Sequence, residues 1–99
     1  MVIESYFLHE NLCHHMVHSQ LLSHRPTLLI IHGLGDSGAS YYNFLFSKEL
    51  RDYNILIPDL LGYGKSSAST DYSFQCQVTG ILKHIDYLQN QQGIESILI

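Results

Sequence analysis

An unbroken apolar run at residues 28–31 is the strongest feature of the hydrophobic pattern. Its residues are Leu-Leu-Ile-Ile, without the polar alternation of a half-exposed strand, and the run is too short to span a membrane. We therefore expect a strand that is covered on both faces, as in a parallel sheet flanked by helices. The glycines that follow it, Gly33, Gly35 and Gly38, permit backbone conformations that a Cβ atom would forbid. The strand should end in a loop at the sheet edge where ligands bind.

The chain before this run has the pattern of a hairpin. Residues 2–9 and 12–19 are strand-like, and Glu10-Asn11 between them is typical of a tight turn. Residues 20–26 form a polar connector to the central strand. We therefore predict an antiparallel hairpin at the N-terminus.

The chain after the run alternates between helical and strand-like patterns. Residues 40–51 have apolar positions at helical spacing, with Ser40 as the expected N-cap, and residues 54–58 and 97–99 are apolar runs typical of buried strands. Ser73 is expected to cap a second helix, whose apolar stripe comprises Phe74, Val78, Ile81, Leu82, Ile85 and Leu88. This order predicts an α/β fold, with a mostly parallel sheet flanked by helices and right-handed crossovers.

Composition limits the chain to one globular domain. It has 99 residues, of which 45% are hydrophobic and 14% charged, which excludes a disordered chain. The net charge of −4, with five Lys and Arg residues spread singly, provides no basic stripe, so we expect no nucleic-acid partner. The N-terminus shows no basic segment followed by an apolar one, so we expect no signal peptide and a cytoplasmic location.

The cysteines and clustered histidines allow a metal site to be considered. Cys13 and Cys76 lie in apolar surroundings and are expected to be reduced packing residues. His14 and His18 would share a face at zinc-pair spacing if their segment were helical, but His15 stands where a metalloprotease motif needs glutamate. As a strand, the segment would be an ordinary solvated one. We therefore expect no metal and no organic cofactor.

Two motifs together give the chain a family resemblance. The central strand is followed by His32-Gly33-Leu34-Gly35-Asp36-Ser37-Gly38, and the next strand is followed by Asp59-Leu60-Leu61-Gly62-Tyr63-Gly64-Lys65-Ser66. This arrangement resembles the N-terminal part of an α/β-hydrolase, over the chain from Leu12 onwards. The family more often has arginine where this chain has Leu61, which removes a polar anchor and leaves the fold expectation intact. The resemblance makes residues 1–99 the N-terminal portion of a single hydrolase domain.

The resemblance implies hydrolysis of a carboxylic ester, a thioester or a related bond, with a small acyl compound as substrate. In this family the nucleophile stands on a Gly-x-Ser-x-Gly elbow after the strand that residues 97–99 begin, and the acid and histidine follow it. All three would lie beyond Ile99, so none of the triad is present and the chain alone should be inactive.

The part retained is the oxyanion-side loop, where fixed backbone N–H groups stabilise the charge of a tetrahedral intermediate. Leu34 is the expected donor, and Gly33 and Gly35 allow the turn around it. His32 is expected to orient the loop rather than to act as a base. Asp59, Gly62, Gly64 and Ser66 belong to the second-motif loop.

Other interpretations stay open at this point. Gly35-Asp36-Ser37-Gly38 resembles the block of Gly-Asp-Ser lipases, which would make Ser37 the nucleophile, although the second motif argues against it. A trypsin-like fold is excluded, because it would need antiparallel barrels and upstream His and Asp partners, whereas this chain alternates strand and helix. A phosphate loop ending in Lys65-Ser66 is disfavoured because Asp59 would repel phosphate and no helix opens directly after it.

A non-catalytic fragment or interaction module is the alternative from a different class. In the family's strand order, the strand at residues 97–99 lies at a sheet edge, and an uncovered apolar edge invites pairing with another chain. We therefore expect marginal stability or self-association through this edge.

Overall fold

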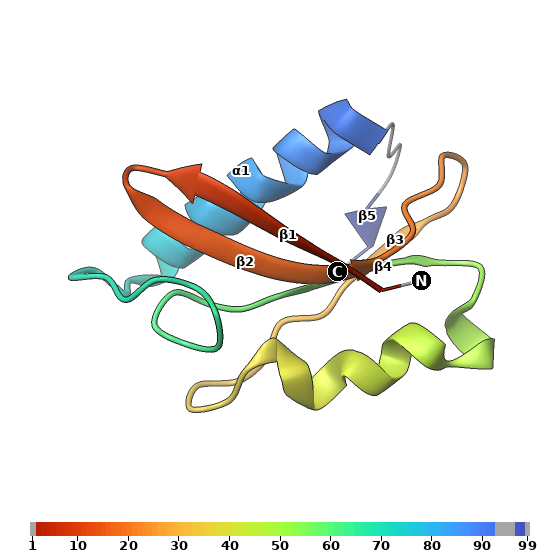
Figure 1. The fold of residues 1–99 in the computed structure, drawn as a ribbon, viewed down its shortest axis with the longest axis horizontal. Helices are drawn as coiled ribbons and strands as arrows, with labels where there is room; N and C mark the ends of the chain where they lie inside the picture. Colours follow the sequence, from red (N-terminus) through yellow and green to blue (C-terminus); the bar gives the residue numbers. More distant parts are fainter. Residues whose placement is uncertain (1, 93–96, 99) are drawn as a thin grey trace.

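The computed structural model describes residues 2–92 and 97–98, whose strands form one five-stranded sheet (Figure 1). Across the sheet the order is β1 (Val2–His9), β2 (Leu12–Ser19), β4 (Asn54–Pro58), β3 (Thr27–Leu29) and β5 (Ile97–Leu98). β2 is antiparallel to both of its neighbours, whereas β3 is parallel to both β4 and β5. All described strands except β2 therefore point the same way, which confirms the mostly parallel α/β sheet. Ile99, expected to belong to the last strand, lies outside the described residues.

The N-terminal hairpin is confirmed in its strands, its turn and its register. β1 and β2 pair from Val2 opposite Ser19 to His9 opposite Leu12. The two turn residues, Glu10 and Asn11, have φ values of 51° and 63°. Positive φ at both central positions is the geometry of a type I′ turn, whose twist matches that of the flanking strands.

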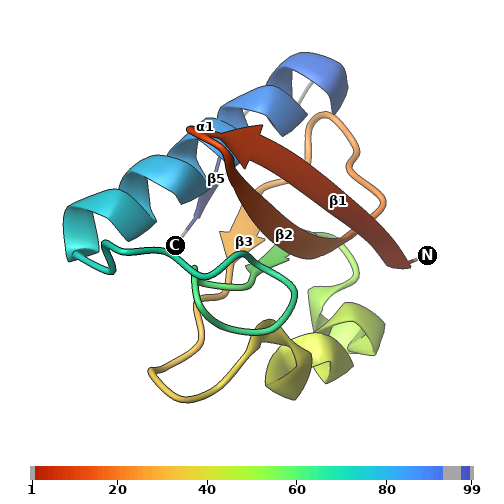
Figure 2. The ribbon, with the colours of Figure 1, turned by 60° about the vertical axis from the view of Figure 1, so that its left-hand side comes forward.

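Helical segments cover both faces of the sheet (Figures 1 and 2). The helix α1 (Phe74–Gln92) lies on one face, and the 3₁₀ segments η1 (Gly38–Phe46) and η2 (Lys48–Leu50), drawn yellow to green, lie toward the other. The core lies under α1 and contains Met16, Leu21, Leu29, Leu56, Ile81, Ile85 and Leu88. Full burial of each such side chain contributes about 1.5–3 kcal/mol. None of the described helices is long and apolar enough to cross a membrane.

The apolar stripe predicted for α1 is wrong at two of its positions. Phe74 and Leu82 are 84% and 55% exposed, while Gly80 and His84 are buried. The face of α1 that contains Gly80 and His84 packs against the sheet, because glycine leaves room for a close contact there. In this orientation of the helix, Leu82 points toward solvent. The predicted cap is confirmed, since the Ser73 hydroxyl accepts a hydrogen bond from the Cys76 amide at 3.2 Å.

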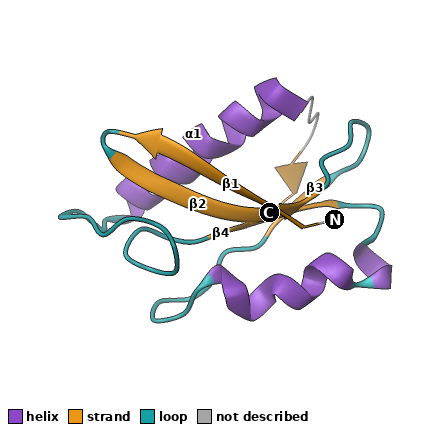
Figure 3. Ribbon diagram, in the orientation of Figure 1, coloured by secondary structure: helices purple, strands orange, loops and turns teal. Residues whose placement is uncertain are grey.

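The helix predicted over residues 40–51 forms as two short 3₁₀ segments instead of one α-helix (Figure 3, purple). Ser47 interrupts it with an extended backbone, φ −73° and ψ 127°, and its amide bonds to the carbonyl of Phe44 in the 3₁₀ pattern. Ser37 rather than Ser40 stands at the cap position, without a side-chain hydrogen bond.

The apolar run at residues 28–31 is covered less fully than its composition predicts. β3 ends at Leu29, although the Ile30 amide still bonds to the Leu56 carbonyl at 2.9 Å. Ile31 is 46% exposed. The described part of β5 pairs only with Thr27 and Leu28, so the carboxyl end of β3 has no described strand on that side.

Candidate functional site

The loop after β3 is a tight turn with an apolar residue at its tip. The Asp36 amide bonds to the Gly33 carbonyl at 3.2 Å, and Gly35, third in this turn, has φ 80°. A positive φ at the third position is typical of type II turns and favours glycine there. Leu34 at the second position is 85% exposed. The turn therefore presents the Leu34 backbone and side chain at the carboxyl end of β3.

His32 joins this first loop to the loop after β4. Its ring is 3% exposed, with Nδ1 2.7 Å from the Gly33 carbonyl oxygen and Nε2 3.0 Å from the Leu60 amide nitrogen. An amide can only donate and a carbonyl can only accept, so the ring is neutral and carries its proton on Nδ1. The Nε2 lone pair is occupied by Leu60 and is not free to take a proton from a nucleophile. This geometry suits the orienting role expected for His32, which stays a prediction.

The Leu34 amide makes no hydrogen bond within the described residues. Beside it lies a groove of about 340 Å³, lined by Ile31, Leu34, Leu60, Tyr63, Tyr72, Phe74, Gln77, Val78 and Ile81. The groove brings a free backbone donor and an apolar surface together. Such a combination suits an uncharged group that carries one polarised oxygen.

Asp59, at the start of the second loop, holds both loops through one carboxylate. It is 3% exposed; Oδ1 accepts the Gly38 amide at 2.8 Å, and Oδ2 accepts the Lys65 amide at 3.0 Å and faces His15 Nδ1 at 2.7 Å. Burial alone would raise the pKa of Asp59. The amides of Lys65 and Gly38 and the ring of His15 outweigh burial and hold this pKa below its ordinary value. Asp59 is therefore a structural anion.

Ser66 and the glycines of the second motif shape the loop around this carboxylate. The Ser66 hydroxyl accepts the His15 amide at 2.9 Å and donates to the Asp59 carbonyl at 2.7 Å. Gly62 and Gly64 have φ values of 85° and 53°, and a Cβ at Gly64 would collide with the Asp59 carboxylate. Gly64 and Ser66 are thus brought together around Asp59, whereas Gly62 lies against Tyr72. No helix follows Ser66 directly, so the phosphate-loop geometry is absent from this described segment.

Ser37 sits at the start of η1 and not beside a base. Its amide bonds to Asp36 Oδ1 at 2.8 Å, and Asp36 also accepts the Ser40 hydroxyl. The Ser40 hydroxyl, followed by the Ser37 amide, lowers the pKa of Asp36. Within the described residues no histidine is hydrogen-bonded to the Ser37 hydroxyl, so this alternative nucleophile lacks the activation it would need.

The histidines of β2 are buried, which corrects the expectation of a solvated strand. His14, His15 and His18 are 4%, 1% and 3% exposed, because α1 covers one face and the second loop covers the other. The segment is a strand, so the helical zinc spacing of His14 and His18 does not apply. No group of three or more metal-binding side chains is found among the described residues.

His15 contacts the candidate site, and sequence reasoning missed it. Its partner Asp59 lies 44 positions away, and only the pairing of β2 with β4 brings the two side chains together. The signal available in the sequence was alternation, which places His15 on the opposite face from His14.

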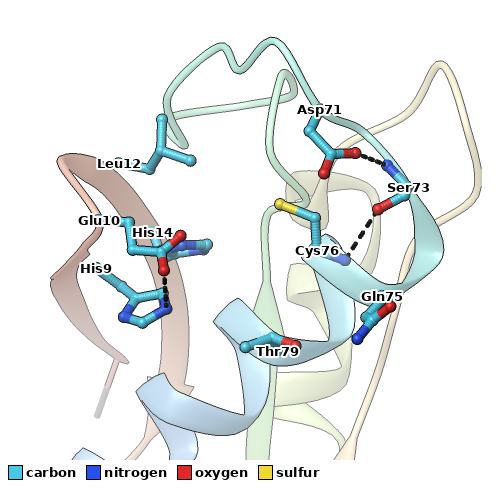
Figure 4. Close-up of a pocket in the computed structure, with 9 residues that line it drawn as sticks. All are labelled: His9, Glu10, Leu12, His14, Asp71, Ser73, Gln75, Cys76 and Thr79. Atoms are coloured by element: carbon cyan, nitrogen blue, oxygen red, sulfur yellow. Dashed lines mark hydrogen bonds and ion pairs between the residues drawn. The ribbon is translucent and has the colours of Figure 1, made fainter.

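A second hollow, of about 210 Å³, lies between the hairpin tip and the start of α1 (Figure 4). Its hydrogen bonds belong to the capping of α1: the Ser73 amide donates to Asp71 Oδ1 at 2.8 Å, and the Ser73 hydroxyl accepts from Cys76. Cys13 and Cys76 are free and half-buried, so they are packing residues only in part. The polar groups here stabilise the helix end.

Comparisons with known proteins identify a family and a fold. A family model described as alpha/beta hydrolase fold matches residues 26–99. Lipase 1 of Psychrobacter immobilis is 41% identical over 54 residues, which make up 52% of this chain and 16% of the lipase.

Two solved structures have the same arrangement of elements. The thioesterase domain from the curacin biosynthetic pathway matches with a TM-score of 0.74 and 22% identity, over 88% of this chain and 33% of that one. The epoxide hydrolase CorEH matches with a TM-score of 0.74 and 20% identity, over 89% of this chain and 30% of that one. The chain spans about a sixth of the length of the curated relatives it matches.

Proposed function

Because the chain belongs to the α/β-hydrolase fold family, we propose that it forms the N-terminal portion of a hydrolase domain and supplies half of its oxyanion hole. The donor is the Leu34 amide, and the bond cleaved is a carboxylic ester, a thioester or a related bond. The nucleophile, the acid and the catalytic histidine would come from residues that follow β5.

One observation supports this proposal most directly. The Leu34 amide donates no hydrogen bond within the described residues, while hydrogen bonds hold the chain before and after its turn in place. His32 ties the turn to Leu60, and Asp59 binds the Gly38 amide at the end of the same loop. A donor that is already in position stabilises an oxyanion without reorganising during the reaction. The adjacent apolar groove suits an acyl group.

The coding sequence just past Ile99 should specify Gly-x-Ser-x-Gly, and another sequence there would contradict the proposal.

A backbone substitution tests the hydrogen-bond donor. In the polypeptide that includes this elbow, Leu34→Pro removes the N–H yet suits the second position of the turn. We expect kcat to fall about 10²–10³-fold. Leu34→Ala keeps the N–H and is the matched control; equal losses in both variants would rule out the donor role.

The alternative nucleophile is tested on the 99-residue chain itself. We expect a fluorophosphonate probe to leave the chain unlabelled. Labelling that disappears in Ser37→Ala would establish the Gly-Asp-Ser lipase interpretation and overturn the proposal that the nucleophile lies elsewhere.

Self-association is the proposed behaviour of the chain when it is isolated. β5 lies at one edge of the described sheet, and the apolar groove beside the carboxyl end of β3 is open. Such an edge is a template for pairing with another strand. Sedimentation should show concentration-dependent association, whereas a cooperatively melting monomer would contradict it.

A further inference from the structure

His15 lies between two carboxylates from different parts of the fold. Its ring is 1% exposed, with Nδ1 2.7 Å from Asp59 Oδ2 and Nε2 2.9 Å from Glu4 Oε1. Glu4 belongs to β1, and Asp59 begins the loop after β4. The imidazole therefore bridges the edge strand and the carboxyl edge of the sheet.

The hydrogen-bond chemistry of this bridge requires two protons on the ring. An ionised carboxylate only accepts hydrogen bonds, so both ring nitrogens of His15 must donate to satisfy both contacts. Lys65 contacts the same two carboxylates: its Nζ donates to Glu4 Oε1 at 2.8 Å, and its backbone amide donates to Asp59 Oδ2 at 3.0 Å. Two cations then balance two anions, and a neutral His15 would leave the buried Asp59 carboxylate with one donor fewer or break the contact with Glu4.

We propose that His15 is an imidazolium clamp, a positioning residue that holds the Asp59 carboxylate and, through it, both loops of the candidate oxyanion site. The link to the first loop is the Gly38 amide, and the link to the second is the Lys65 amide. When the ring loses its second proton, the clamp loosens and the protection of both amides falls. The consequence for the Leu34 amide rests on the proposed function, whereas the clamp itself does not.

The ionisable groups around His15 show which charges its ring meets. The titratable groups around it are Glu4 and Tyr6 of β1, Asp59 and Lys65 of the second loop, and His84 of α1. Of these, only Lys65 and His84 can carry positive charge. The Lys65 ammonium donates a hydrogen bond to Glu4, and burial lowers the pKa of His84 so that its ring is neutral in neutral solution. The pKa of Glu4 is lowered by its hydrogen bonds to Lys65 and then to His15. Both carboxylates, whose pKa values are lowered, are therefore ionised acceptors for the two ring nitrogens.

Nuclear magnetic resonance of the ¹⁵N-labelled 99-residue chain tests the protonation state. We expect the His15 ring to show two protonated nitrogens at neutral pH, while the His32 ring shows one. As pH rises, loss of the second proton from His15 should coincide with at least a tenfold drop in hydrogen-exchange protection of the Gly38 amide. A singly protonated His15 ring at neutral pH would overturn the clamp.

Two variants separate the clamp from simple packing. Glu4→Gln removes one negative partner at an exposed position, so it should leave α1 protected while His15 gives up its second proton at a lower pH. His15→Phe fills the space without donors and should reduce protection at Gly38 and Lys65 at least tenfold more than at α1. If Glu4→Gln leaves the pH at which Gly38 protection is lost unchanged, the proposal is overturned even if His15→Phe does not fold. These measurements need no nucleophile or ester, so a failed Leu34 test would not affect them.

Discussion

Gly80 of α1 lies against the ring of His14 on β2, so close that a Cβ on Gly80 would overlap the imidazole Cε1. Both residues are buried. This contact sets the distance between the helix and the sheet, because neither the strand backbone nor the ring can retreat without disturbing the core beside it. It also explains why α1 turns Leu82 outward.

Gly80→Ala should destabilise the chain although alanine is the better helix former. The propensity gain is about 1 kcal/mol, whereas forcing a methyl group into a filled site costs about 1–3 kcal/mol. We expect a net loss in the free energy of urea unfolding. The same substitution in a His14→Ala background should cost at least about 1 kcal/mol less, as a double-mutant cycle measures. Thr79→Ala, at an exposed position of the same helix, is the control.

Acid should weaken the contact between α1 and the hairpin before it affects the carboxylates. Burial, and then the neighbouring His14, His18 and His15, lowers the pKa of His84 from 6.5 to about 4. The unfolded chain therefore binds more protons between these values, so stability is present above pH 6.5 and is lost as pH falls toward 4. The full contribution is about 3 kcal/mol.

Urea unfolding at several pH values checks this window. His84→Phe keeps a ring for stacking on Phe7, which lies 5.6 Å away in the native chain, and should flatten the stability profile between pH 6.5 and 4. An unaltered slope in His84→Phe would contradict the assignment to His84.

Local patterns in the sequence predicted the hairpin and the Ser73 cap because each is decided by neighbouring residues. The parallel strands were predicted from the alternation of strands and helices along the chain. The exposure of Ile31 and Leu82 was not predictable, since it depends on which segment lies opposite. Burial of His14 and His18 required the position of α1, and the bond from His15 to Asp59 required the pairing of β2 with β4. The residues of the two loops were found by resemblance, but it does not indicate that His15 of β2 contacts the Asp59 carboxylate or that Glu4 of β1 contacts His15.

Replacing His32 should release the second loop rather than unfold the chain. His32→Phe leaves the Leu60 amide without its acceptor, and a buried donor left unsatisfied costs about 1–3 kcal/mol. We expect faster hydrogen exchange at Leu60, with α1 unchanged. Tyr63→Phe, which keeps the edge contact of the ring with His32 at 5.5 Å, is the control. Unchanged protection at Leu60 in His32→Phe would show that the bond does not restrain the loop.

Three loop glycines separate backbone strain from steric conflict. A Cβ at Gly33 would meet nothing within 4 Å, and the φ of Gly33 is not positive. Gly35 also has open space around its Cβ position, but its φ is 80°. Gly62 has a φ of 85°, and a Cβ there would lie 2.6 Å from the Tyr72 ring. We expect alanine to change the free energy of unfolding by less than about 0.5 kcal/mol at Gly33. Left-handed backbone strain should cost about 1–2 kcal/mol at Gly35. The loss should be largest at Gly62, where Tyr72 must also move. Adding Tyr72→Ala should bring the cost at Gly62 down to that at Gly35, because only the steric part depends on the ring; a cost that persists would assign the whole effect to the backbone.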